Sequence, residues 1–310
     1  MTIGLNSFLV LGFTHINVDI DRRKQFVLKD GSSAIYNENK KEKWLSIYGT
    51  NPHAAYNVWK SIRKQAEKQK ITTKYFFWTM QFLKSKDPKR TVANTINVDR
   101  NIFAAWVKKV LLLIQANHHK WISWNMRLPN CSATYKYKTT TDGVDFITHE
   151  HRKGHENVKT KNRKNFDPKM YSHKFKHSGW RYEVCVSIYN DAIVWINGPF
   201  KAGENNDLGI FIKPGGLRDA LRAHSEVTIA DNLYKGHKEA SYRSKGNKKW
   251  KKQKARVLAR HESVNSRLKA FGRLDSSFYC KKNEHRTIFI ASAVFVQADM
   301  QFKPLMDSFE

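Results

Sequence analysis

The chain has 310 residues, of which 40% are apolar and 13% aromatic, so it can bury a sizeable core and does not have a disordered composition. Lysine and arginine number 56 against 27 aspartate and glutamate residues, which gives a formal net charge of +29. This excess of positive charge attracts polyanions and makes nucleic acid the first-choice partner, although a ribosome-associated or simply basic protein would have the same balance.

The cysteines and the apolar runs exclude other classes. Cys131, Cys185 and Cys280 are far apart and odd in number, which argues against a disulfide framework and against a cysteine zinc site. The runs Ser7–Phe13 and Leu111–Ile114 are too short to span a bilayer. We therefore expect a chain without a membrane span, in a reducing compartment.

The first half of the chain has helical periodicity. Residues 1–43 have no clear pattern, but apolar residues recur at spacings of three and four from Trp44 onwards, which predicts a helical domain over residues 44–125. Thr50 or Asn51 is expected to cap a helix that starts at Pro52, and Asn97 to cap a helix over Val98–Gln115. The basic outer faces fit a DNA-binding domain, and they equally fit solvated charge on an ordinary helical domain.

The second half, residues 130–305, alternates strands and helices, which predicts a mixed α/β domain. The expected elements, in chain order, are a strand within 131–147, a hairpin of Arg181–Tyr189 and Ala192–Asn197 ended by Gly198-Pro199, an interrupted helix over Leu208–Leu221, a strand over Glu226–Asp231, a helix over Ala255–Gly272 and a buried helix over Thr287–Gln301.

A basic run precedes the penultimate helix. Residues Lys245–Lys254 contain six lysines and one tryptophan. Such a run binds phosphates or serves as a nuclear import signal, and a plain exposed loop explains it nearly as well.

Three acidic residues occupy positions where regular elements would present them. Asp142 lies in a predicted strand, Asp231 ends another, and Glu262 lies on a predicted amphipathic helix. Hard divalent cations prefer carboxylate oxygens, and two such ions can assist phosphoryl transfer. In the first strand Asp142 and Asp145 face opposite sides, and the pattern alone does not decide between them.

Two other groups carry weaker signals. His149, His151 and His155 have a spacing that metal ligands can adopt, but they lack a fourth ligand, and a solvated loop is the preferred interpretation. Asp207 is the best candidate for a fourth acid, although a helix-capping role is preferred for it.

Five ordered stretches of the second half resemble a DDE transposase of the PIF/Harbinger (IS5-like) group in the RNase H-like superfamily. The stretches are Thr141–Phe146, Tyr171–Lys176 with Tyr182–Val184, Trp195–Phe200 with Asn206–Leu208, Ala230–Gly236 and Ala259–Phe271. The chain departs from that pattern at Val144 and Leu233.

This resemblance implies an RNase H-like domain over residues 130–305 and a triad of Asp142, Asp231 and Glu262 that holds Mg²⁺ or Mn²⁺, with two ions in all. It selects Asp142 rather than Asp145. It further implies metal-dependent cleavage and joining of transposon ends in the nucleus, by a homo-oligomer on DNA, with a separate DNA-binding partner protein as an option. The main alternative is a transposase-derived DNA-binding protein without catalytic activity.

Overall fold

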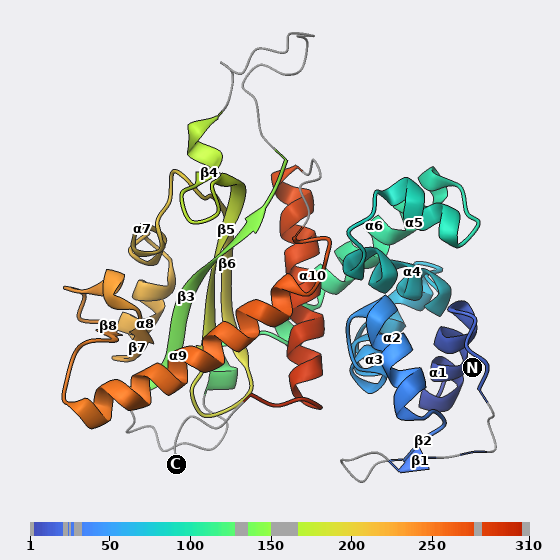
Figure 1. Cartoon of the computed structure of the whole chain (residues 1–310), viewed down its shortest axis with the longest axis horizontal. Coiled ribbons are helices and arrows are strands. Elements are labelled where there is room, and N and C mark those ends of the chain that lie inside the picture. The colour runs from blue at the N-terminus through green and yellow to red at the C-terminus, as the bar shows by residue number, and fades with distance from the viewer. Residues whose placement is uncertain are drawn as a thin grey trace. The chain divides into compact units, whose positions relative to one another are not determined.

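The computed structural model describes residues 3–20, 24, 26–27, 33–127, 136–149, 167–275 and 281–305, and its elements are drawn in Figure 1. The chain forms two compact units. The first contains the residues up to Trp121, together with Ala270–Arg273 and Thr287–Lys303. Among the described residues, the second contains the stretches between Ile122 and Lys269 and between Leu274 and Arg286, together with Pro304 and Leu305.

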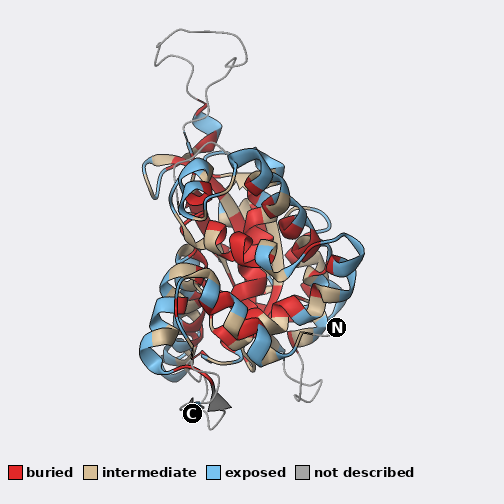
Figure 2. Ribbon diagram, turned by 90° about the vertical axis from the view of Figure 1, so that its right-hand side faces the viewer, coloured by how far each residue is buried: buried red, intermediate tan, exposed pale blue. Residues whose placement is uncertain are grey.

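The first unit is mainly helical. Its elements are α1 (Leu5–His15), the two-stranded ladder of β1 (Phe26–Val27) and β2 (Ser33–Ala34), α2 (Glu38–Tyr48), α3 (Pro52–Lys68), α4 (Thr73–Lys84), α5 (Lys89–Thr95), α6 (Arg100–Ala116), the short η1 (His118–Lys120) and most of α10 (Lys282–Met300). Helical periodicity from Trp44 onwards was therefore a sound basis for expecting helices, whereas α1 had no readable signal. Figure 2 shows buried and exposed residues alternating along these helices.

Two predicted helix caps had different outcomes. Asn51 caps α3 as expected, because its side chain accepts a hydrogen bond from the backbone N–H of His53 at 2.9 Å, and Pro52 is the first helical residue. The prediction of Asn97 as a cap was wrong. Asp99 caps α6 instead, accepting from two backbone N–H groups at 2.8 and 3.1 Å, while Asn97 takes a left-handed conformation with φ of 51°.

The second unit is a mixed α/β domain. Its strands are β3 (Tyr137–Ile147), β4 (Tyr171–Ser172), β5 (His177–Ser187), β6 (Ile193–Lys201), β7 (Val227–Ala230) and β8 (Ala240–Tyr242). Its helices are α7 (Asp207–Phe211), α8 (Leu217–Ala223) and α9 (Lys248–Lys269), with the short turns η2 (Trp124–Arg127), η4 (Pro168–Met170) and η5 (Asn232–Tyr234). The predicted interruption between Leu208 and Leu221 is confirmed.

The strands form one sheet in which β3 is central. The spatial order is β6-β5-β3-β7-β8, with β4 pairing with the first residues of β5. β3, β5 and β6 are successive antiparallel neighbours, whereas β7 runs parallel to β3 and β8 parallel to β7. The C-terminal end of β7 is thereby brought beside the middle of β3.

Two boundary predictions were wrong. Gly198-Pro199 does not end β6, which continues to Lys201 because a register shift against β5, between Arg181 and Glu183, accommodates the two residues. The penultimate helix starts at Lys248 rather than Ala255, so most of the basic run is helical and not a loop.

Helices cover both faces of this sheet. α9 packs across β3 and β7 on one face, as Figure 1 also shows, whereas α7 contacts β5 and α8 contacts β7. Two separate apolar clusters follow from this arrangement. In one cluster, Ile188 and Ile229 pack against Val257 of α9. In the other, Cys185 of β5 packs with Phe211 of α7 and Leu221 of α8.

Candidate carboxylate site

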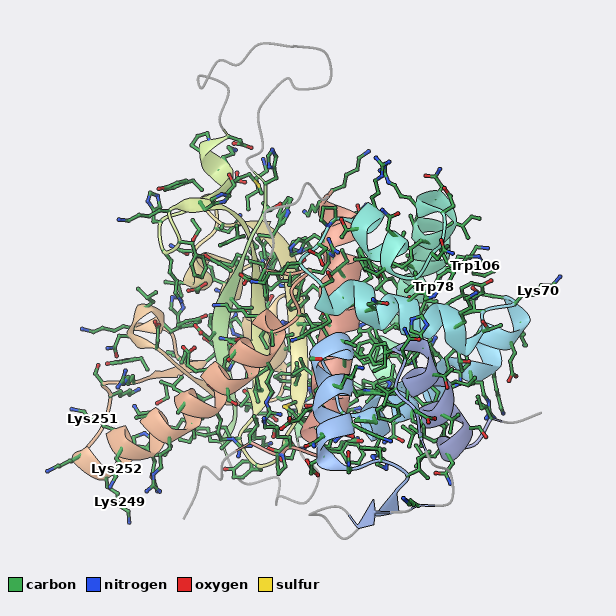
Figure 3. All side chains as sticks on the ribbon, turned by 45° about the vertical axis from the view of Figure 1, so that its right-hand side comes forward. Lys70, Trp78, Trp106, Lys249, Lys251 and Lys252 are labelled. Carbon is green, nitrogen blue, oxygen red and sulfur yellow. The ribbon has the colours of Figure 1, made fainter. Side chains whose placement is uncertain are left out.

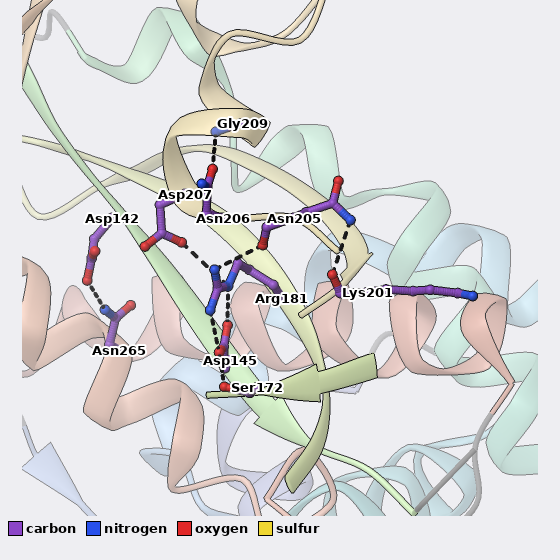
Figure 4. A network of polar contacts seen from close by, with 10 residues as sticks. All are labelled: Asp142, Asp145, Ser172, Arg181, Lys201, Asn205, Asn206, Asp207, Gly209 and Asn265. Atoms are coloured by element: carbon purple, nitrogen blue, oxygen red, sulfur yellow. Dashed lines mark hydrogen bonds and ion pairs between the residues drawn. The ribbon is translucent and has the colours of Figure 1, made fainter. Parts of the chain in front are cut away.

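Asp142 lies near the middle of β3, on the face that α9 covers. Its neighbour across the ladder is Val184, and the side-chain amide of Asn265 from α9 donates a hydrogen bond to its Oδ2 at 3.2 Å (Figure 4). Burial, together with the negative charges of Asp207 and Glu262, raises the pKa of Asp142 to about 7. Several carboxylates are therefore close enough to disfavour the ionised form of Asp142.

Asp231 follows β7 directly. Thr140 of β3 pairs with Ile229 of β7, and two residues further along these parallel strands lie Asp142 and Asp231. The half-buried Asp231 carboxylate accepts a hydrogen bond from the backbone N–H of Leu233 at 2.8 Å, which caps η5. Asp231 thus directly follows a strand that pairs with β3, and its Oδ1 is already engaged by a backbone donor.

Glu262 is an exposed residue of α9. Its charge acts on Asp142, and Asn265, three residues further on, is the residue that contacts Asp142 directly. Arg260 points away from these acids and donates to the backbone carbonyl of Asn190 at 3.1 Å. One face of α9 therefore presents Glu262 and Asn265 toward the strand that carries Asp142.

Asp145 has the opposite environment. Its carboxylate receives two hydrogen bonds from the Arg181 guanidinium, at 2.5 and 2.7 Å, and a third from the Ser172 hydroxyl at 2.7 Å (Figure 4). Asp145 and Arg181 are directly opposite each other on the face of the sheet away from α9. This aspartate is compensated by a cation, and the geometry gives it a structural role.

Asp207 was expected to cap a helix, and this prediction was wrong. The cap of α7 is Asn206, which accepts from the backbone N–H of Gly209 at 2.6 Å. The Asp207 carboxylate instead packs against Gly143, where an added Cβ would lie 1.7 Å from its Oδ1. Arg181 Nε is 3.5 Å from the same oxygen. Burial raises the pKa of Asp207, as do the charges of Asp145 and Asp231, while Arg181 lowers it.

Glu183 is a further acid that the sequence patterns did not single out as functional. It lies on β5 directly opposite Gly143 of β3. Its side chain is 2% exposed and accepts a hydrogen bond from Trp195 Nε1 at 3.0 Å. Burial raises its pKa to about 7. A glutamate inside the apolar run of β5 was the available signal. Burial, with the charges of Asp207, Glu183, Asp142 and Asp231, also raises the pKa of the Tyr234 hydroxyl.

The donor atoms of this cluster are all oxygens. Glu183 Oε1 and Asp207 Oδ1 are buried without a hydrogen-bond partner, and mutual repulsion with Asp207 and Glu262 contributes to the raised pKa of Asp142. A hard divalent cation bound by Asp142 would relieve the repulsion that raises the pKa of this carboxyl. As they stand, no three His, Cys, Asp or Glu side chains in the described part of the chain are close enough together to hold an ion.

The three histidines with metal-ligand spacing are only partly within the described residues. His149 is described, whereas His151 and His155 lie outside the described residues.

Basic side chains gather on the first turns of α9. Lys248, Lys249, Lys251 and Lys252 are exposed, and Figure 3 labels three of them. These lysines lie at the N-terminal end of the helix, where cations are unfavourable. The first turn contains no acidic residue that would offset their charge. Figure 3 also labels Trp106 of the first unit, which stacks on Tyr75 at 3.9 Å between ring centroids.

Within the described residues, no helix is long and apolar enough to cross a membrane. Comparison of the chain with protein-family models, curated proteins and solved structures found no match.

Proposed function

We propose that the second unit is a metal-dependent DNA endonuclease of the transposase type, with Asp142, Asp231 and Glu262 as its metal-binding carboxylates. The carrying observation is the uncompensated carboxylate on β3. Asp142 is half-buried among acids, and α9 contributes a hydrogen-bond donor to it rather than a cation. Clustered acids with raised pKa values occur preferentially at functional sites, because repulsion between them is costly unless a ligand offsets it.

The strand arrangement supports an RNase H-like assignment. Three antiparallel strands are followed, through α7 and α8, by β7 running parallel to β3. An RNase H-like domain is expected to have this order, with one aspartate on the first strand, another after the fourth and an acid on a late helix. Asp142, Asp231 and Glu262 match those three positions.

Asp142, Asp231 and Glu262 would hold Mg²⁺ or Mn²⁺, with Asp207 as the nearest additional acid. When bound, two such ions supply a polarised attacking oxygen and a stabilised leaving oxygen. Asn265 orients the Asp142 carboxylate through its hydrogen bond at 3.2 Å. The lysine-rich start of α9 attracts the phosphate backbone.

The wider proposals follow from the resemblance and the charge. The formal net charge of +29 favours DNA as the substrate. Transposon ends and target DNA, two metal ions, assembly as a homo-oligomer on DNA, a separate DNA-binding partner protein and a nuclear location belong to the same proposal. So does the assignment of DNA contacts to the helical unit.

Nicking of supercoiled DNA in Mg²⁺ or Mn²⁺ tests the proposal. We expect nicking by the wild-type protein and its loss in Asp142→Asn, with DNA affinity nearly unchanged, because the substitution removes a metal ligand and leaves the basic surfaces intact. Asp145→Asn is not a suitable control, because it breaks an ion pair with Arg181. Asp219→Asn on α8 is the better one, because it keeps a side-chain oxygen that can accept from the Gly215 N–H. A wild-type protein that binds DNA but never nicks it in Mn²⁺ excludes the enzyme.

That last outcome would support a transposase-derived DNA-binding protein without turnover. One observation favours this second candidate: Glu262 is exposed.

A further inference from the structure

Two lysines share one aromatic ring next to the carboxylates. The ammonium group of Lys174 lies 5.9 Å from the centroid of the Phe175 ring, and that of Lys269 lies 5.0 Å from it. Phe175 belongs to the turn between β4 and β5, whereas Lys269 is the last residue of α9. We call these three residues the Phe175 clamp. It joins two segments that are 94 residues apart in the chain, counted from Phe175 to Lys269.

The turn that carries Phe175 is anchored on the strand of the site. The backbones of β4 and β5 pair on either side of it, and the Ser172 hydroxyl donates to Asp145 Oδ2 at 2.7 Å. Asp145 is three residues from Asp142 on β3. Lys174 accordingly lies close enough to lower the pKa of both Asp142 and Asp207. The clamp therefore stands at the rim of the carboxylate cluster.

Among the described residues, the two ammonium groups form no ion pair. Within the described residues, no carboxylate lies within ion-pair distance, 4.0 Å, of Lys174 or Lys269. Each ammonium group is attracted to the Phe175 ring, and the two positive charges repel each other. An anion placed between the two lysines would convert this repulsion into attraction.

The geometry of α9 sets the distance from the clamp to the acids. Lys269 follows Glu262 by seven residues, which is nearly two full turns, so both residues lie on the same side of the helix. The exposed Ser266 lies between them on that side. Seven residues of helix span ~10 Å, which is about three nucleotides of axial rise along one DNA strand.

We propose that the Phe175 clamp binds a phosphodiester group of the DNA strand about three nucleotides from the bond held at the carboxylates. This inference rests on the proposed function, because it needs DNA at the acids. Lys174 and Lys269 each contact the phosphate, and Phe175 keeps their ammonium groups in place. The clamp sets where the strand lies relative to Asp142 and takes no part in the chemistry.

The test measures DNA affinity as a function of salt. All proteins carry Asp142→Asn so that no strand is cut, and Lys174→Ala/Lys269→Ala is compared with Lys169→Ala/Lys176→Ala. The control pair removes the same charge from exposed positions of the same region, outside the clamp. Two lost phosphate contacts should lower the salt slope by about 2. Between 50 and 200 mM salt, the affinity of the parent should then fall about tenfold more than that of the clamp variant.

A second measurement locates the contact. Bound duplex DNA should protect Lys174 and Lys269 from an amine-reactive probe and leave Lys169 reactive, as read by mass spectrometry. A parent and a clamp variant with equal salt slopes, or clamp lysines that stay reactive on DNA, would overturn the inference and leave the proposed function standing. A parent protein that binds no DNA at any salt would overturn both, so the two failures are distinguishable.

Discussion

The two faces of β3 treat similar acids in opposite ways. On the face away from α9, Asp145 receives three hydrogen bonds, two of them from the Arg181 guanidinium. On the face under α9, Asp142 accepts one side-chain hydrogen bond, from the neutral amide of Asn265, and the charges of Asp207 and Glu262 raise its pKa. A compensated and an uncompensated carboxylate therefore lie only three positions apart on one strand.

This difference separates a structural acid from a candidate ligand. A buried ion pair with complete hydrogen bonds fixes the geometry of the strand, and removing one partner leaves an uncompensated charge. Acids that repel one another reduce stability, so a cluster of them is expected where a cation or a reaction makes use of it. Both residues are aspartates, so the residue type alone does not distinguish the structural acid from the candidate ligand.

The largest expected effect is on the compensated face. Asp145→Ala should lower the free energy of unfolding by about 3–5 kcal/mol, because the half-buried Arg181 loses its principal partner. Urea denaturation followed by circular dichroism measures the change. Asp142→Asn should instead raise the free energy of unfolding by about 1 kcal/mol, since it relieves repulsion with Asp207 and Glu262. Equal destabilisation by both substitutions would remove the contrast between the faces.

The buried acid Glu183 adds a pH dependence to the comparison. Its pKa is raised from 4.5 to about 7 by burial, so the folded state binds more protons than the unfolded state between these values. Stability from this group is therefore present below about pH 4.5 and is lost as pH rises to about 7, by on the order of 3 kcal/mol. Glu183→Gln keeps an oxygen that can accept from Trp195 and removes the titration.

Urea denaturation at several pH values between 5 and 8 measures this effect. The wild-type free energy of unfolding should fall more steeply with pH than that of Glu183→Gln. The difference between the two slopes is the quantity to compare, because Asp142 titrates in the same range in both proteins. Parallel curves would mean that Glu183 does not titrate as a buried acid.

The sequence predicted most elements because local signals and the fold agree for them. The helix periodicity of α3 and α6, the turn between the two hairpin strands and the interruption of the helix over Leu208–Leu221 each reflect short-range chemistry. The ends of strands and helices were less predictable where pairing with a distant segment sets them. β6 continues through Gly198-Pro199 because β5 accommodates it with a register shift, and no local signal encodes that partner.

The candidate site was only partly predictable for the same reason. Asp142 and Asp231 could be assigned to strands, but their proximity depends on the parallel pairing of β3 with β7. Asp207 looked like a helix cap because Asx residues favour that position, and Asn206 takes it instead. Glu183 was missed as functional because its burial depends on Trp195 and on the opposite strand.

Asn265 allows a smaller test of the uncompensated face. Asn265→Ala removes the one side-chain donor to Asp142 Oδ2 and should cost about 1 kcal/mol of stability. If Asn265 orients Asp142 for metal binding, the substitution should also weaken Mn²⁺ binding several-fold, as measured by calorimetry. Ser266→Ala, at the next and exposed position of α9, is the matched control and should change neither quantity. Unchanged Mn²⁺ affinity in Asn265→Ala would restrict the amide to a packing role.

Gly143 connects the two faces, because it lies beside Asp142 and supports Asp207. Gly143→Ala should cost about 1–3 kcal/mol, since the new methyl group would meet the Asp207 carboxylate at 1.7 Å and the carboxylate must move. Asp207→Ala empties that space, so the double variant should be less destabilised than the sum of the single changes. A coupling energy near zero from this cycle would mean that Asp207 does not pack against Gly143. The fourth acid would then have no fixed place beside Asp142, and the carboxylate cluster would be reduced to the acids under α9.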